Sequence, residues 1–182
     1  MDVPSTGRSA PIENGCILGR LVPTAREAIA LPMSGRSIDV PVTRIAFAAW
    51  TGEPIADTYG GKPVLDVAGH PLFAELAILR ELESNGWKGV WVDSYSRRML
   101  TGWPAIRGEM DRGPRRMFDG ISQLRRGRSW DVFAWCDDKV LFAEAKRRGK
   151  DAIRDQQRAW LEAALERGLT PTEFLLVEWS LA

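Results

Sequence analysis

The segment Val140–Lys150 (VLFAEAKRRGK) places a carboxylate and an amine two residues apart at the end of an apolar run. Alternate residues of a β-strand share a face, so a strand here would put Glu144 and Lys146 on the same side as Val140 and Phe142. Charged groups on an apolar face cost free energy unless they are paired or bind a ligand. The spacing therefore predicts a polar site at the end of a hydrophobic strand.

A second carboxylate belongs to the run before it. The apolar segments Trp130–Trp135 and Lys139–Ala145 are separated by only three residues, which predicts a hairpin and brings Asp131 near Glu144. Two carboxylates in contact repel, and a divalent cation removes that penalty. Mg²⁺ prefers oxygen ligands and takes one or two carboxylates, and we expect Mn²⁺ to substitute for it. Lys146 would then lie where a phosphate or an attacking water would be.

Two predicted helices carry further polar residues on or beside their apolar stripes. In Asp151–Arg167, Gln157 lies four residues after Ile153 and three before Trp160, so its amide should face a polar group. In the earlier helix, which we expect to begin at Pro71, Glu75 borders the packing face. Both are candidates for the same site.

Plainer readings of these residues remain open. Glu144 and Lys146 could belong to one long helix that continues through Gly149. Asp131 could simply begin a strand, Glu75 could be a solvated surface acid, and Gln157 could be half-exposed at the edge of its stripe.

The remaining elements predict an α/β fold with a central mixed sheet flanked by helices. Residues 1–40 are rich in Pro, Gly and Ser and read as a poorly ordered or peripheral arm, and residues 41–182 as one domain. The expected order is a strand at Arg44–Trp50, a helix ending at Asn85-Gly86, a strand at Gly89–Tyr95, an insertion at 94–129, the hairpin, the helix Asp151–Arg167 and a strand at Thr172–Leu181.

The insertion at 94–129 differs from its surroundings in charge. It contains nine arginines and three acidic residues, a formal charge of +6, whereas the whole chain has a formal charge of +1. Concentrated arginine favours contact with nucleic-acid phosphates, although a solvated loop would have the same composition. The candidate DNA-binding residues are Arg97, Arg98, Arg112, Arg115, Arg116, Arg125, Arg126 and Arg128, followed after the proposed site by Arg147, Arg148 and Lys150.

Cysteine usage and hydropathy suggest where the protein works. Cys16 and Cys136 are far apart and have no CxxC or histidine partners, so we expect two unpaired thiols in a reducing compartment. No signal-peptide pattern or membrane-length apolar run is visible. We therefore expect a cytoplasmic protein of bacterial or phage origin that has no membrane partner.

Residues from about Pro71 to Trp179 resemble the PD-(D/E)XK nuclease superfamily, most closely its VRR-NUC branch. The resemblance rests on Asp131, the Glu144-Ala145-Lys146 triplet, the glycine loop after it and Gln157-Arg158-Ala159-Trp160. Two departures are Trp130, where the family has proline, and a longer insertion. The resemblance implies a restriction-endonuclease-like core, here with a basic insertion and an N-terminal extension.

The resemblance also implies a role for each matching residue. Asp131, Glu144 and the carbonyl of Ala145 would bind the metal, and Glu75 would match the carboxylate that some members carry on the first helix. Lys146 would activate water and stabilise charge on the phosphate, and Gln157 would match the branch's glutamine near the site. We therefore expect a magnesium-dependent nuclease that hydrolyses DNA phosphodiester bonds.

Other functions remain as alternatives. A non-catalytic nucleic-acid-binding or assembly module could keep the same fold, and an unrelated protein could dock its basic segment on an acidic partner. Cutting two strands usually takes two sites, which favours a homodimer.

Overall fold

The computed structural model describes residues 16, 18–23, 27–125 and 127–182. Ten strands in this part form one sheet: β1 (Ala28–Met33), β2 (Arg36–Ala49), β3 (Leu65–Val67), β4 (His70–Leu72), β5 (Lys88–Asp93), β6 (Arg98–Gly102), β7 (Ile106–Arg107), β8 (Val132–Cys136), β9 (Lys139–Arg147) and β10 (Phe174–Leu181). The helices are α1 (Ala74–Glu83), α2 (Arg112–Leu124) and α3 (Asp155–Glu166), with short 3₁₀ turns at Gly19–Leu21 and Pro171–Glu173.

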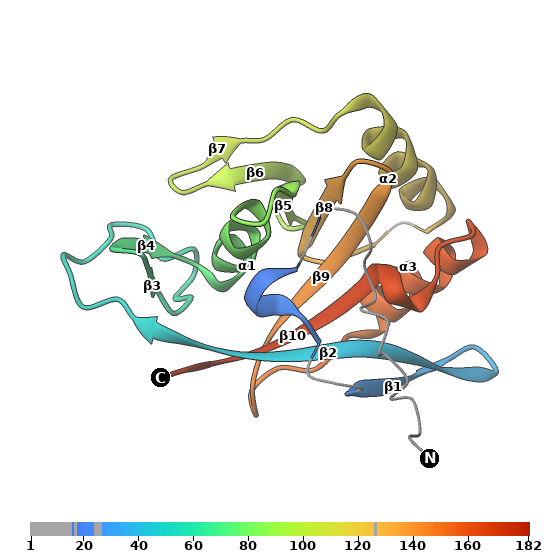
Figure 1. Ribbon diagram of the computed structural model, residues 1–182, viewed down its shortest axis with the longest axis horizontal. Helices are drawn as coiled ribbons and strands as arrows, with labels where there is room; N and C mark the ends of the chain where they lie inside the picture. The colour runs from blue at the N-terminus through green and yellow to red at the C-terminus, as the bar shows by residue number, and fades with distance from the viewer. Residues whose placement is uncertain (1–15, 17, 24–26, 126) are drawn as a thin grey trace, which may run out of the picture.

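The sheet is mixed, as the sequence predicts. Its strand order is β4-β3-β2-β10-β9-β8-β5-β6-β7, and β1 pairs with β2 outside this path. The strand β10 runs parallel to both β2 and β9, and the other pairings are antiparallel. Figure 1 shows α1 on one side of β8 and β9, and α2 and α3 on the other. The result is a helix–sheet–helix sandwich in which both faces of the central strands are covered.

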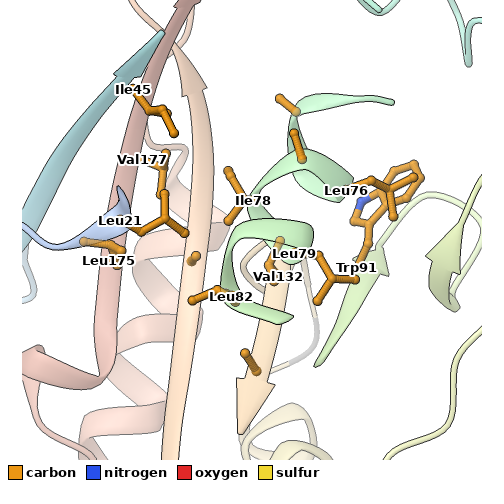
Figure 2. Packing of buried hydrophobic residues seen from close by; sticks show 14 of the residues in the cluster. Leu21, Ile45, Leu76, Ile78, Leu79, Leu82, Trp91, Val132, Leu175 and Val177 are labelled. Carbon is orange, nitrogen blue, oxygen red and sulfur yellow. The ribbon is translucent and has the colours of Figure 1, made fainter. Parts of the chain in front are cut away.

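The face covered by α1 is aliphatic. Leu76, Leu79 and Leu82 recur at helical spacing and are fully buried, which gives α1 its packing stripe. Figure 2 shows α1 directing its side chains toward strands that carry Val177 and Val132. The helix ends at Glu83, and the turn that follows contains Gly86 with a left-handed φ of 84°, close to the end that the Asn85-Gly86 pair predicts.

The face covered by α2 and α3 is aromatic. Phe142 of β9 stacks on Phe133 of β8 with ring centroids 4.4 Å apart, and Trp160 of α3 meets Phe142 edge-on at 4.8 Å. Phe118 of α2 lies 5.7 Å from Trp160. This layer extends along the same face of β9 that carries Glu144 and Lys146, so the candidate site lies at the end of a packed core.

Several element boundaries differ from those predicted. Pro71 lies in β4 and not in a helix, and α1 begins three residues later, at Ala74. The helix α3 begins at Asp155 and not at Asp151, whose carboxylate accepts the backbone N–H of Arg147 (3.2 Å) in the preceding loop. The strand predicted at Arg44–Trp50 is the second half of the longer strand β2, which ends at Ala49.

Part of the segment predicted as an N-terminal arm is folded. Within residues 1–40, positions 28–33 and 36–40 belong to β1 and β2, which pair from Ala28↔Pro41 to Met33↔Arg36. Leu31 and Val40 from these strands are buried in the aromatic layer. Residues 1–15 lie outside the described part of the chain. The basic insertion is also folded, because it supplies β6, β7 and α2.

The prediction of two unpaired thiols is wrong, because Cys16 and Cys136 form a disulfide. They are 120 residues apart in sequence, and only the fold brings their Cα atoms to 6.6 Å. The tip of the β8–β9 hairpin meets the N-terminal segment, whose Leu18 and Leu21 belong to the core beneath α1. The cysteines therefore give no reason to expect a reducing compartment.

A search of the described residues finds no helix with both the length and the apolar character needed to span a membrane.

Candidate functional site

The two predicted carboxylates meet where the β8–β9 hairpin opens. The register pairs Val132 with Ala143, which places Asp131 beside Glu144. The backbone N–H of Asp131 donates to Glu144 Oε2 (3.1 Å), and the N–H of Ala145 donates to Asp131 Oδ2 (3.2 Å). Each carboxylate is thus fixed by the backbone of the opposite strand. Because Glu144 and Lys146 lie on β9, the single long helix is excluded.

Burial makes this pair electrostatically unfavourable without a cation. Glu144 is fully buried, and Asp131 is partly exposed toward a cavity. Loss of hydration and then the charge of Glu144 hold the pKa of Asp131 well above its usual range. Burial also raises the pKa of Glu144, although Lys146 opposes that shift. In the metal-free protein Asp131 therefore retains a proton to higher pH than an ordinary aspartate.

An ammonium and an amide complete the polar cluster. Lys146 Nζ lies 2.7 Å from Glu144 Oε1 and 3.2 Å from Gln157 Oε1, and Lys146 is only 8% exposed. Gln157 Nε2 donates to the same Glu144 oxygen. Gln157 is 4% exposed, so it does not lie half-exposed at the edge of its helix. The polar residue on the apolar stripe of this helix, Gln157, thus directs its side chain at Glu144.

The start of α3 is fixed to the site through Gln157. Gln157 Oε1 accepts the backbone N–H of Arg154 (3.0 Å), which caps the first turn of the helix. Trp130 Nε1 donates to the backbone carbonyl of Gln157 (3.2 Å), and its ring meets Phe174 at 5.0 Å. Trp130 therefore joins the start of β8 to α3 beside the site.

Glu75 is buried but approaches from the other face of the sheet. Its helix, α1, covers the face opposite Glu144, and its charge contributes to the raised pKa of Asp131. Glu75 Oε1 forms an ion pair with Lys62, and among the described residues Oε2 has no hydrogen-bond partner. The three carboxylates do not form a compact ligand group: among described residues, only Cys16, Cys136 and Asp137 bring three candidate ligand atoms within 4.8 Å, and those cysteines are bonded to each other.

Two cavities reach this cluster from either side. One, of about 590 Å³, is lined by Asp131 and Gln157 together with Tyr59, Lys62 and Trp91. The other, of about 340 Å³, is lined by Glu75 and Ala145 and also by Lys62. Lys62 therefore forms part of the wall of both cavities, close to the carboxylates.

Sequence reasoning missed Lys62 and the aromatic residues around it. Lys62 Nζ lies 4.8 Å from the Trp91 ring centroid and 5.4 Å from that of Tyr59, so two rings and Glu75 hold the ammonium. Burial raises the pKa of Tyr59 to about 12, and the negative charge of Asp93 adds to that shift. The YGGKP stretch carries turn signals but no periodicity that would direct Lys62 toward the site. Trp103 packs against Tyr59 at 5.2 Å.

The predicted DNA-binding residues fall into three groups. Arg97, Arg115, Arg125 and Arg128 line a third cavity of about 820 Å³. Arg147 and Lys150 line the smaller cavity at Glu75. The remaining residues do not line these two cavities. Arg98 donates to Ser96 and forms an ion pair with Asp93. Exposed positions outside the cavities are Arg112, Arg116 and Arg148, and Arg126 lies outside the described residues.

The arginine-lined cavity adjoins the cavity at Asp131. Val92, Asp93, Ser94, Arg128 and Ser129 line both. A bound polyanion could therefore contact the guanidinium groups and the carboxylate cluster at the same time.

No protein-family model, curated protein or solved structure matches this chain. The function therefore has to be inferred from the chemistry of the site. A function has to explain three features: a buried carboxylate beside a half-buried one, a buried ammonium group and an adjoining basic cavity.

We expect Asp131→Asn to stabilise the metal-free protein at neutral pH. A carboxyl group whose pKa is raised by folding favours the folded state in acid, and this contribution is lost as the pH rises through the folded pKa. Asparagine cannot ionise and retains an oxygen for the N–H of Ala145. Urea unfolding in EDTA between pH 5 and pH 8 should show a free-energy gain over the wild type that grows with pH.

Asp39→Asn provides the control, because Asp39 is an exposed aspartate on β2. It should follow the wild-type curve at every pH. If Asp131→Asn also followed that curve, folding would not raise the pKa of Asp131, and the electrostatic description of the pair would be wrong.

Proposed function

We propose that this chain is a metal-dependent nuclease that hydrolyses DNA phosphodiester bonds. The observation that carries the proposal is the convergence of Asp131, Glu144, Lys146 and Gln157 at the open end of the β8–β9 hairpin. A mixed sheet with helices on both faces is compatible with a restriction-endonuclease-like core. We therefore propose that the chain is a member of the PD-(D/E)XK superfamily, nearest to the VRR-NUC branch.

The donor set fits a hard divalent cation. Asp131 and Glu144 offer carboxylate oxygens. Burial raises both pKa values, and the charge of Glu144 adds to the shift at Asp131, so a bound cation would favour the ionised pair. We assign the carbonyl of Ala145 to the same ligand set. Glu75, one of whose oxygens has no hydrogen-bond partner among the described residues, is assigned to a contact through water. Bound Mg²⁺ would lower the pKa of water and stabilise charge on the attacking and leaving oxygens.

Lys146 would supply positive charge to the phosphate. Its ammonium is already positioned by Glu144 and Gln157, so little reorganisation is needed during the reaction. In a water-poor site this charge interacts more strongly with a developing negative charge than it would at the surface. Gln157 acts through Lys146 and Glu144, because it bonds to both.

The arginine-lined cavity supports nucleic acid as the substrate. Arg97, Arg115, Arg125 and Arg128 surround a cavity that shares a wall with the acidic site. Guanidinium groups bind phosphates in a fixed geometry and release counterions from the nucleic acid. Phosphates bound there would bring a neighbouring phosphodiester to Asp131.

We expect Lys146→Met to lose cleavage while retaining DNA affinity. Methionine keeps most of the apolar stem but removes the charge, so the rate should fall about a hundredfold or more. Labelled single-stranded, duplex, flapped and branched DNA, incubated with Mg²⁺, Mn²⁺ or EDTA, would measure the loss. Anisotropy in EDTA would measure affinity.

Lys139→Met is the matched control, since Lys139 begins the same strand, β9, at the other end. It should cut at the wild-type rate. Undiminished cleavage by Lys146→Met would remove the proposed mechanism. No cleavage of any DNA by the wild type with either metal would favour a non-catalytic binding module.

The position of the arginines matters more than their number if the cavity binds DNA. We expect the double reversal Arg125→Glu and Arg128→Glu to weaken DNA binding strongly and to flatten its dependence on salt. The double reversal Arg112→Glu and Arg116→Glu changes the net charge equally but outside the cavity, so its effect should be smaller. Equal losses in both variants, measured by anisotropy over a salt series, would contradict binding in the cavity.

A further inference from the structure

The cavity that reaches Asp131 has an aromatic ring at its edge. Tyr95, in the turn between β5 and β6, lines this cavity and is 85% exposed. The other rings that line it, Trp91 and Tyr59, are buried or half-buried and pack against Phe73. Tyr95 thus presents its ring to solvent beside the carboxylate cluster, and packing in the core does not explain an aromatic residue at this position.

The turn that carries Tyr95 is held rigidly from below. Asp93, 3% exposed, accepts the backbone N–H groups of Tyr95 (3.1 Å) and Ser96 (3.2 Å) and also the Ser96 hydroxyl. Arg98 donates to Ser96 Oγ at 2.7 Å. Burial opposes ionisation of Asp93, but these hydrogen bonds lower its pKa on balance. A buried charge is therefore used to fix a surface turn, which reduces the entropy that Tyr95 would lose on binding.

The same turn faces two cavities. Tyr95 lines the cavity at Asp131, while Arg97, two residues later, lines the arginine cavity. Arg97 has a left-handed φ of 55°, a strained conformation for a residue with a side chain. The turn thus presents a flat ring toward the acidic site and a guanidinium group toward the basic cavity.

We propose that the cavity at Asp131 accepts an unpaired nucleotide whose base stacks on Tyr95, while the adjoining phosphates bind in the arginine cavity. The substrate would then be DNA with a single-stranded segment at the point of cleavage. Inside a duplex both faces of a base are covered by its neighbours, so only an unstacked base can offer a face to Tyr95. Arg128, which lines both cavities, supplies positive charge for its phosphate. This inference rests on the proposed function and deepens it.

The test measures stacking without cleavage. A short oligothymidylate with one 2-aminopurine would be titrated with the full chain in EDTA, and affinity and fluorescence quenching recorded. A blunt duplex of equal length is the second probe. We expect the wild type to bind the single strand at least tenfold more tightly than the duplex and to quench the reporter.

Three variants distinguish stacking on the Tyr95 ring from other causes of a change in binding. Tyr95→Ala should weaken single-strand binding about 5- to 100-fold and remove most of the quenching. Tyr95→Phe keeps the ring and should stay within about twofold of the wild type. Ile106→Ala removes another exposed apolar side chain, which lies on β7 and outside this cavity, and should change nothing.

The outcomes distinguish this inference from the nuclease proposal. Equal affinity for single strand and duplex, or wild-type affinity and quenching by Tyr95→Ala, would overturn the stacking site even if the protein cuts DNA. Ring-dependent single-strand binding would support it even if no cleavage occurs with Mg²⁺ or Mn²⁺, although the proposed hydrolysis would then fail.

Discussion

The fold brings two carboxylates together in a place where water cannot easily screen them. Asp131 and Glu144 face each other because the short turn of the β8–β9 hairpin fixes its register. Removing such groups from water favours their neutral forms, and their proximity favours them further. Neighbouring groups offset part of the free-energy cost of burying the pair. Backbone N–H groups donate to both carboxylates, and Lys146 forms an ion pair with Glu144.

The aromatic core gives these polar contacts their precision. Phe133, Phe142 and Trp160 form a packed aromatic layer that ends at Glu144 and Lys146. The side chains of these two charged residues therefore extend from a close-packed surface. Trp130 then fixes α3 to β8, and α3 supplies Gln157. A change in the packing of these rings would move Gln157 relative to Glu144, so the core and the site cannot be treated as independent.

The sequence predicts the features that depend on local pattern. Alternation along β8 and β9, with a three-residue separation, is enough to place Asp131 beside Glu144, and the amide on the apolar stripe of α3 is enough to direct Gln157 inward. The predicted starts of α1 and α3 are less accurate, because Pro71 belongs to a short strand and Asp151 belongs to the loop before α3. Both depend on contacts that a propensity scale does not contain.

Features that depend on distant parts of the chain were not predicted. Cys16 pairs with Cys136 across 120 residues, and Lys62 reaches Glu75 from a turn-rich loop with no periodic signal. Residues 28–40, which form β1 and the first part of β2, were predicted as an arm because Pro, Gly and Ser mask an alternating pattern that becomes clear only when β1 pairs with β2. Tyr95 looks ordinary in sequence, and its significance comes from its exposure beside a cavity.

The most direct test of the account is a calorimetric titration of the metal-free protein with Mn²⁺ in buffers of different ionisation enthalpy. If Asp131 and Glu144 form a cation site, one ion should bind with release of a proton from the pair. Glu144→Gln should abolish that binding. The absence of saturable binding in the wild type, or unchanged binding and proton release in Glu144→Gln, would contradict the central claim.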